Sequence, residues 1–194
     1  MIANTFRQKI AGVFFGSQKT PLDPHQKAYY KCLEASRRRE FYTKFEVSDT
    51  FDGRFDMLCL VMSIYMQKLS KDNEKTKFFS QNLFDAMFKD IDLTLREMGA
   101  GDLGVGKRVK VMSESFMGRL SKYSLSVENK DATLLADTLS RNLYRKDFKV
   151  NEDSKITQFV LNFHEQISSL NSEYLISGDF NMNEFIANCL SNNS

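Results

Sequence analysis

The chain has no tryptophan and only two prolines among its 194 residues, and both prolines, Pro21 and Pro24, lie near the N-terminus. Because proline breaks the interior of a helix, the long stretch that follows is open to extended helices. Cysteine is also scarce. Cys32, Cys59 and Cys189 are too few and too widely spaced for a disulfide framework, so we expect buried thiols in a reducing compartment.

Other absences disfavour whole functional classes. The two histidines, His25 and His164, have no second metal ligand at helical or CxxC spacing, which argues against a metal site, and we expect no cofactor. No apolar run approaches the roughly 20 residues that a membrane-spanning helix needs, and no secretory signal is visible. The net charge of +2 is too balanced to indicate a nucleic-acid-binding protein by itself. We therefore expect a cytoplasmic protein, with peripheral contact to a membrane left open.

What the chain does contain is helical patterning almost throughout. Hydrophobic residues make up 42% of the sequence, charged residues 27%, and Phe alone occurs 17 times, as in a globular protein with an aromatic core. Apolar residues recur three and four positions apart, and no segment shows sustained alternation. The spacing predicts helices over 25–45, 55–69, 72–98, from Asp102 to Tyr123, from Asp131 to Leu143, over 156–174 and around 185–189. Asp72 and Asp102 are the expected caps of the third and fourth of these helices. The buried face of the third is predicted to include Met98, and the inward face of the fourth consists of Val105, Val109, Met112, Phe116, Leu120 and Tyr123.

The predicted fold class is all-α, a single helical domain of about seven to eight helices with a central αα-hairpin. We divide it into an amphipathic segment and linker (1–22), a helical core (23–148) and a C-terminal helical extension packed on the core (149–194). The first segment has an apolar stripe at Phe6, Ile10, Val13 and Phe14. We interpret the stripe as a helix that docks on the core, and an interfacial membrane anchor is the alternative.

A dense glycine string lies between the two helices of that hairpin. Four of the nine glycines fall within eight residues, at Gly99, Gly101, Gly104 and Gly106. The first three match the GxGxxG of dinucleotide-binding turns, and Gly101, Gly106 and Lys107 match most of a P-loop. Both motifs require a strand before the loop, whereas 72–98 is predicted to be helical, and Arg108 replaces the Ser or Thr that would hold Mg²⁺. We therefore predict no nucleotide binding.

The glycines instead suit a helix–helix turn. Gly99 stands where a helix often ends in a left-handed residue. Gly104 and Gly106 fall in the first turns of the next helix, where each costs up to about 1 kcal/mol relative to Ala. Such a cost suggests a close backbone approach, by a neighbouring helix or by a ligand.

Charged residues surround this turn, and we take six of them as a candidate partner-binding surface: Arg96, Glu97, Asp102, Lys107, Arg108 and Lys110. Two interpretations remain open. The charges form an ion-pair network within the hairpin, or they form a polar surface kept for a partner. The basic members suit an acidic client segment, ribosomal RNA or anionic lipid equally well.

The same region carries a family resemblance. The runs Phe84–Asp92 and Leu95–Lys110 resemble the signature of the ubiquinol–cytochrome c chaperone family. Further agreement lies at Phe41–Tyr42, Asp49–Asp56, Phe116–Arg119 and Arg141–Asn142, so the resemblance covers about residues 26 to 145. The sequence departs from the family pattern at Ser48, Gly106 and Met117.

The resemblance implies a non-enzymatic assembly factor of the cytochrome bc1 complex, without catalytic residues. Members in mitochondria bind newly made cytochrome b, a partner subunit and the ribosome exit region, and this chain looks like the shorter bacterial type. Cytochrome b or another bc1 subunit is thus the implied client. The alternative is an RNA- or ribosome-binding helical module that combines Arg37–Arg39 with the basic residues after the glycines.

Overall fold

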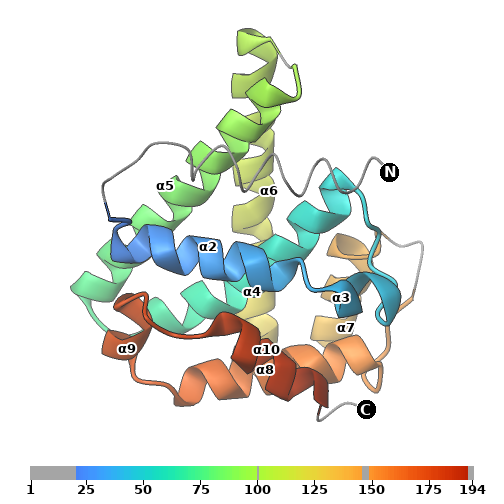
Figure 1. Cartoon of the computed structure of the whole chain (residues 1–194). Coiled ribbons are helices and arrows are strands. Elements are labelled where there is room, and N and C mark those ends of the chain that lie inside the picture. The colour runs from blue at the N-terminus through green and yellow to red at the C-terminus, as the bar shows by residue number, and fades with distance from the viewer. Residues whose placement is uncertain (1–20, 100, 146–148, 192–194) are drawn as a thin grey trace.

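Helices make up most of the computed structural model, which describes residues 21–99, 101–145 and 149–191 (Figure 1). Within those ranges no strand occurs, and the all-α prediction is confirmed. The helices are α2 (Pro24–Ser36), α3 (Arg39–Thr43), α4 (Phe51–Leu69), α5 (Glu74–Glu97), α6 (Asp102–Glu128), α7 (Ala132–Asn142), α8 (Lys155–Ser169), α9 (Ser172–Ile176) and α10 (Met182–Ser191). The apolar stripe predicted in the N-terminal segment lies outside the described residues.

Helix α4 forms the centre of the body. Fifteen of its 19 residues are buried, because α2, α5, α6 and α8 all pack against it. Its sequence from Met57 to Met66 is almost continuously apolar, as expected of a helix covered on every side. The helix begins at Thr50, whose side chain caps it by accepting a 3.1 Å hydrogen bond from the Gly53 N–H.

The C-terminal helices pack on this body. Helix α8 lies against α4 and α7, and α10 crosses α2 and α8 (Figure 1). The Phe159 ring of α8 meets the rings of Phe41 and Phe45 at centroid distances of 5.2 and 5.7 Å. These contacts join residues after 149 to the rest of the fold, while the division of the chain at 148 stays a prediction.

The central αα-hairpin consists of α5 and α6, and its tip projects from the body (Figure 1). The body end of the hairpin buries Met87, Phe88, Phe116 and Tyr123 among the other helices. The two helices continue beyond the body, where they have mainly each other to pack against. The glycine string therefore lies at the end of an arm rather than in the core.

Several local predictions are corrected, among them the helix expected over 156–174, which is interrupted at the extended backbone of Leu170 between α8 and α9. The expected helix over 25–45 is interrupted, because the extended backbone of Arg38 separates α2 from α3 and its guanidinium donates to Glu40 at 2.6 Å. Helix α5 is capped by Asn73, not Asp72. The Asn73 side chain accepts from the Thr76 N–H at 3.1 Å, and the Thr76 hydroxyl accepts from the Asn73 N–H in return, which completes a capping box.

Candidate functional site

The turn at the hairpin tip is built as the glycines predict. Helix α5 ends at Glu97 with Met98 as its C-cap, and Gly99 follows with a φ of +86°, in the left-handed region that only glycine adopts without strain. The N-cap of helix α6 is Gly101. We expected Asp102 to be the cap, and this prediction is wrong. The Asp102 carboxylate is engaged elsewhere, with the Arg96 guanidinium.

The remaining glycines have open space around them. A Cβ atom added to Gly101, Gly104 or Gly106 would meet no described atom within 4 Å. Glycine inside a helix lowers stability, and we considered two reasons for it here: close approach by a neighbouring helix or by a ligand. The first reason is excluded within the described structure. Approach by a ligand remains.

The polar residues of the tip divide into two groups. In the first group, Arg96 joins the two helices of the hairpin. Its Nε donates to Asp92 Oδ2 at 2.6 Å, and its Nη1 pairs with Asp102 across the turn. These contacts raise the pKa of the Arg96 guanidinium, chiefly through the hydrogen bonds to the two carboxylates. For Arg96 and Asp102, the ion-pair interpretation is thus supported.

The second group is not neutralised within the hairpin. Lys107, Arg108 and Glu97 are exposed, and no ion pair joins any of them to another described residue. Lys110 approaches only Glu114, at 3.9 Å and with both side chains largely exposed. Such a surface contact adds little stability. These cations therefore support the interpretation as a surface for a partner.

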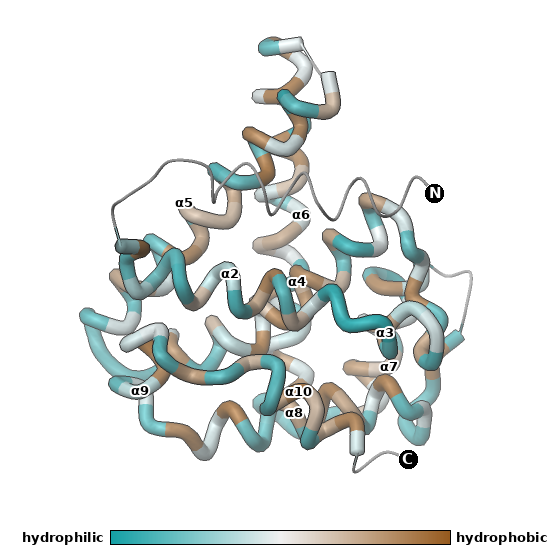
Figure 2. The backbone as a smooth tube through the Cα atoms, viewed as in Figure 1, coloured by the Kyte–Doolittle hydropathy of each residue, from teal (hydrophilic) through white to brown (hydrophobic). Residues whose placement is uncertain are grey.

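Exposed apolar side chains accompany these cations. The side chain of Leu103 is 96% exposed, Val111 lies exposed two turns further along α6, and Met98 is 52% exposed. Figure 2 shows that hydrophobic and hydrophilic segments both occur along the projecting arm. The sequence pattern placed Met98 on the buried face of α5, and this prediction is wrong. The periodicity continues to the end of the helix, whereas the body that would cover this face ends earlier.

A cleft lies near the other end of the hairpin, at the body. The cleft, of about 490 Å³, opens between the C-terminal end of α4, α5 and α6. Its apolar lining comes from Met66, Phe84, Met117 and Leu120. Gln67, only 2% exposed, also lines the cleft, and its Oε1 atom accepts no hydrogen bond from the described residues. We did not predict this cleft, although a glutamine directly after the apolar run of α4 was a visible signal.

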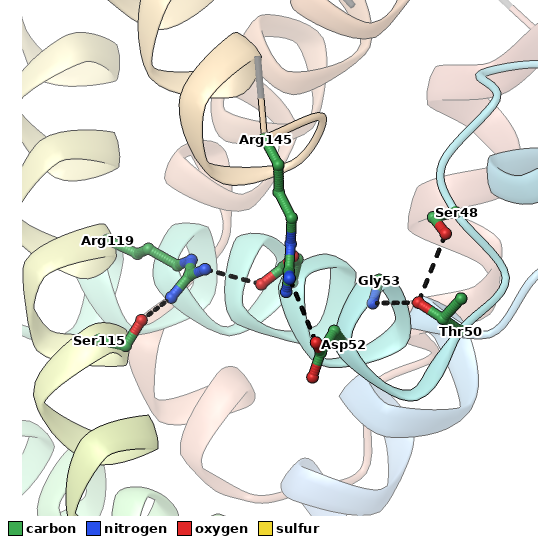
Figure 3. Close-up of polar contacts among 8 residues, drawn as sticks. Ser48, Thr50, Asp52, Gly53, Ser115, Arg119 and Arg145 are labelled. Carbon is green, nitrogen blue, oxygen red and sulfur yellow. Dashed lines mark hydrogen bonds and ion pairs between the residues drawn. The ribbon is translucent and has the colours of Figure 1, made fainter. Parts of the chain in front are cut away.

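A buried charge cluster attaches the hairpin to the body, and it too was missed at the level of sequence. The Asp56 carboxylate of α4 accepts from Arg119 Nη2 of α6 at 2.7 Å and from Arg145 Nη2, after α7, at 3.1 Å. In Figure 3 the Arg119 and Arg145 side chains both point at α4. Burial raises the pKa of the Asp56 carboxyl, and the two arginines act in the opposite direction. The signal was an aspartate between Phe55 and Met57, on a face where apolar residues are expected.

The basic run Arg37–Arg39 belongs to a different part of the surface. Arg38 pairs with Glu40 and donates to the Asn183 carbonyl at 3.4 Å, so it is engaged with the body. The run lies at the junction of α2 and α3, whereas Lys107 and Arg108 lie on the projecting arm (Figure 1). The structure does not bring the two basic groups together.

Ligand chemistry elsewhere is limited. Within the described ranges, no three His, Cys, Asp or Glu side chains gather as a metal site would require. None of the helices in those ranges combines the length and the hydropathy needed to cross a bilayer. The three cysteines are buried thiols, as predicted. The pKa of His164 is lowered, and burial is the main cause.

Comparison with known proteins places these features in a family. The family model described as ubiquinol-cytochrome C chaperone matches residues 43–185, which include the hairpin, the cleft and the Asp56 cluster. The ubiquinol-cytochrome c reductase complex assembly factor 1 proteins of Mus musculus and Homo sapiens are each 20% identical over 148 residues, or 76% of this chain. The chain spans 50% of the length of each of these two proteins.

A solved structure is also similar. The crystal structure of the Cbp3 homolog from Brucella abortus has a TM-score of 0.71 and 30% sequence identity to this chain. The similarity covers 93% of this chain and 95% of the other. The shared fold therefore extends over almost the whole of both proteins.

Proposed function

This chain belongs to the ubiquinol–cytochrome c chaperone family, and from that premise we propose a non-enzymatic assembly factor that binds newly synthesised cytochrome b, or another bc1 subunit. Binding would be stoichiometric and would take place at the cytoplasmic face of the membrane. The observation that carries the proposal is the projecting hairpin. It presents cations with no described partner beside exposed apolar side chains, within the range that the family model matches.

We assign the partner contact to the six polar residues of the tip, with different roles. Arg96 and Asp102 hold the turn through their ion pair, so that the tip keeps its shape. Contact with acidic segments of the client is made by Lys107, Arg108 and Lys110 on α6. Glu97, the last residue of α5, contributes a carboxylate on the other side of the turn. Charged rims of this kind set the rate and the specificity of association more than its strength.

The cleft between α4, α5 and α6 would supply the apolar part of the contact. Its walls include Met66 and Met117, whose flexible thioether side chains adapt to varied apolar surfaces. The Gln67 Oε1 atom, buried and without a described donor, suits a backbone or side-chain N–H of the client. An unassembled membrane subunit offers both apolar side chains and free N–H donors.

The test is co-purification from respiring membranes solubilised in mild detergent. Tagged wild-type protein is expected to recover cytochrome b, and the double variant Lys107→Glu/Arg108→Glu is expected to recover about tenfold less, because like charges would then face the client. The matched control is Lys149→Glu/Lys155→Glu, which reverses two exposed cations outside the hairpin. Equal recovery by both double variants would remove the hairpin from the contact. Absence of every bc1 subunit from the wild-type sample would reject the function.

The alternative, an RNA- or ribosome-binding module, is favoured by one observation, the exposure of Lys107 and Arg108 without described ion-pair partners. It predicts that purified protein binds ribosomal RNA with an affinity that falls steeply as salt rises. Undetectable binding at low ionic strength would exclude the alternative and leave the client proposal intact.

A further inference from the structure

The end of the hairpin has the form of a small apolar apex. Leu103 is 96% exposed, more than any other large hydrophobic side chain that the structure describes, and Met98 across the turn is 52% exposed. Both flank the turn that joins α5 to α6, and this turn is the outer end of the projecting arm (Figure 1). Because Gly101, Gly104 and Gly106 add no side chains around them, the apex is narrow and convex.

Three cations lie on α6 behind the apex, at distances set by the rise of the helix. Lys107, Arg108 and Lys110 are four, five and seven residues beyond Leu103 on α6, which places them about 6 to 10 Å behind it along the helix axis. Segments that lie in a membrane interface bury their apolar side chains about 5–10 Å into the boundary between headgroups and acyl chains. The cations would therefore stand at the level of the lipid phosphates when Leu103 is buried.

Charge complementarity identifies the surface that this apex fits. Between residues 96 and 110 four cations face two carboxylates, and Arg96 already pairs with one of those carboxylates. The remaining excess is positive and lies on α6. An apolar point with a positive rim on a convex tip matches a flat, anionic, penetrable surface, whereas a protein partner would have to provide a concave and acidic pocket.

We infer that the apex of the α5–α6 hairpin docks on an anionic lipid bilayer, with Leu103 and Met98 in the interface and Lys107, Arg108 and Lys110 on lipid phosphates. This goes beyond the proposed function, because a client in detergent can be bound without any bilayer. The cleft at Met117 is 14 residues from Leu103, about 21 Å along α6, so a client can occupy the cleft while the apex is in the lipid. At a membrane the three cations then bind lipid phosphates in place of acidic client segments. The hairpin would then hold the body at the membrane where a client subunit is inserted.

The experiment is co-sedimentation of the purified full chain with vesicles, in the absence of any client. One set of vesicles is phosphatidylcholine alone, and the other contains equal parts of phosphatidylcholine and phosphatidylglycerol. We expect binding to the anionic vesicles, weakened by salt, and little binding to the neutral ones. Equal binding to both sets, or to neither, would overturn the inference.

Variants separate the two halves of the contact. Lys107→Gln/Arg108→Gln is expected to weaken binding by roughly 25-fold, since each cation near an anionic surface contributes about fivefold. Leu103→Ser is expected to weaken it by about tenfold or more through the loss of apolar burial. The control is Phe78→Ser, which removes a 69% exposed aromatic at the body end of α5 and should leave vesicle binding unchanged.

All four positions are exposed, so unchanged thermal unfolding will verify that the variants are folded. If Leu103→Ser retains vesicle binding but loses the client in detergent, the apex is a protein-docking site and the inference is wrong. If it loses vesicle binding but recovers the client normally in detergent, the inference stands independently of the proposed function.

Discussion

The Asp56 carboxylate of α4 and the Arg119 guanidinium of α6 form a 2.7 Å ion pair in which the side chains are 1% and 12% exposed. Arg145 completes the cluster by binding the second carboxylate oxygen. The pair fixes the middle of α6 to the central helix, and α6 extends about 24 Å from Arg119 to Leu103. The hairpin is thus anchored at the body and exposed at its tip.

Removal of this anchor should be costly. We predict that Asp56→Ala lowers the free energy of unfolding by about 3–5 kcal/mol, because Arg119 would remain buried without its counter-charge. Urea unfolding followed by far-UV circular dichroism will measure the change. Asp52→Ala is the matched control, since Asp52 also binds Arg145 but is largely exposed, and we expect a loss of about 1 kcal/mol or less. Similar losses for the two variants would contradict a buried anchor.

Gly53 is required by a close backbone approach. A Cβ atom at this position would overlap the Ser48 carbonyl oxygen, which lies against the first turn of α4. We predict that Gly53→Ala destabilises the protein by about 1–3 kcal/mol, because the segment before α4 must shift. Gly118→Ala, at an open position inside α6, should instead stabilise it by up to about 1 kcal/mol. Thermal unfolding of both variants will show whether their effects differ in sign.

The glycines of the tip should be replaceable without loss of stability. A Cβ atom at Gly104 or Gly106 meets open space, and both residues lie within α6. We predict that Gly104→Ala and Gly106→Ala each stabilise the protein by up to about 1 kcal/mol. Gly99→Ala should destabilise it by about 1–2 kcal/mol, because its φ is +86°. The double variant Gly104→Ala/Gly106→Ala can be more stable and yet bind client or vesicles less well. That result would mean that these positions require glycine so that a ligand can approach the backbone closely.

A buried hydrogen bond between Tyr29 and Asp90 should make stability depend on pH. The Tyr29 hydroxyl donates to Asp90 Oδ2 at 2.6 Å and so links α2 to α5. Burial raises the pKa of the Asp90 carboxyl, and the hydrogen bond from Tyr29 opposes this rise. A carboxyl whose pKa is raised by folding contributes most stability below its unfolded pKa, and the contribution is lost as pH rises through the folded pKa.

We therefore predict that Tyr29→Phe costs about 1–3 kcal/mol at pH 7, because the buried Asp90 carboxyl would lose its hydrogen-bond donor. The cost should shrink as pH falls and Asp90 becomes protonated. Tyr65→Phe is the control, because the Tyr65 hydroxyl donates to the neutral Leu175 carbonyl at 2.9 Å. Urea unfolding between pH 4 and pH 7 should show a pH-dependent cost for Tyr29→Phe and a constant cost for Tyr65→Phe.

Much of the local structure could be predicted from residue patterns because it depends on near neighbours. The inward face of α6 follows the predicted spacing at Val105, Phe116 and Tyr123, and Asp131 caps α7 by accepting from the Leu134 N–H at 2.8 Å. The helical context of the glycine string is also confirmed. Helix periodicity and capping act over a few residues, so the sequence expresses them directly.

Other features could not be predicted because they depend on distant segments. Asp56 and Arg119 are 63 residues apart. The residue pattern of α4 does not indicate which helix supplies the partner of its buried carboxylate. The exposure of Met98 depends on where the body ends, which the periodicity of α5 does not record. The same holds for the cleft, since Gln67 and Met117 come together only when α4, α5 and α6 pack.

By itself, the sequence determined the helical class, the hairpin and its glycine turn, and the family to which the chain is similar, because these follow from short-range spacing and contiguous motifs. Only the tertiary structure decided which charges of the turn are neutralised. Arg96 and Asp102 neutralise each other because the turn brings them together, whereas Lys107 and Arg108 are exposed and form no ion pair with a described residue, on an arm that projects from the body. Burial and charge pairing are properties of the assembled fold, and on this arm they separate a structural ion pair from a surface for binding.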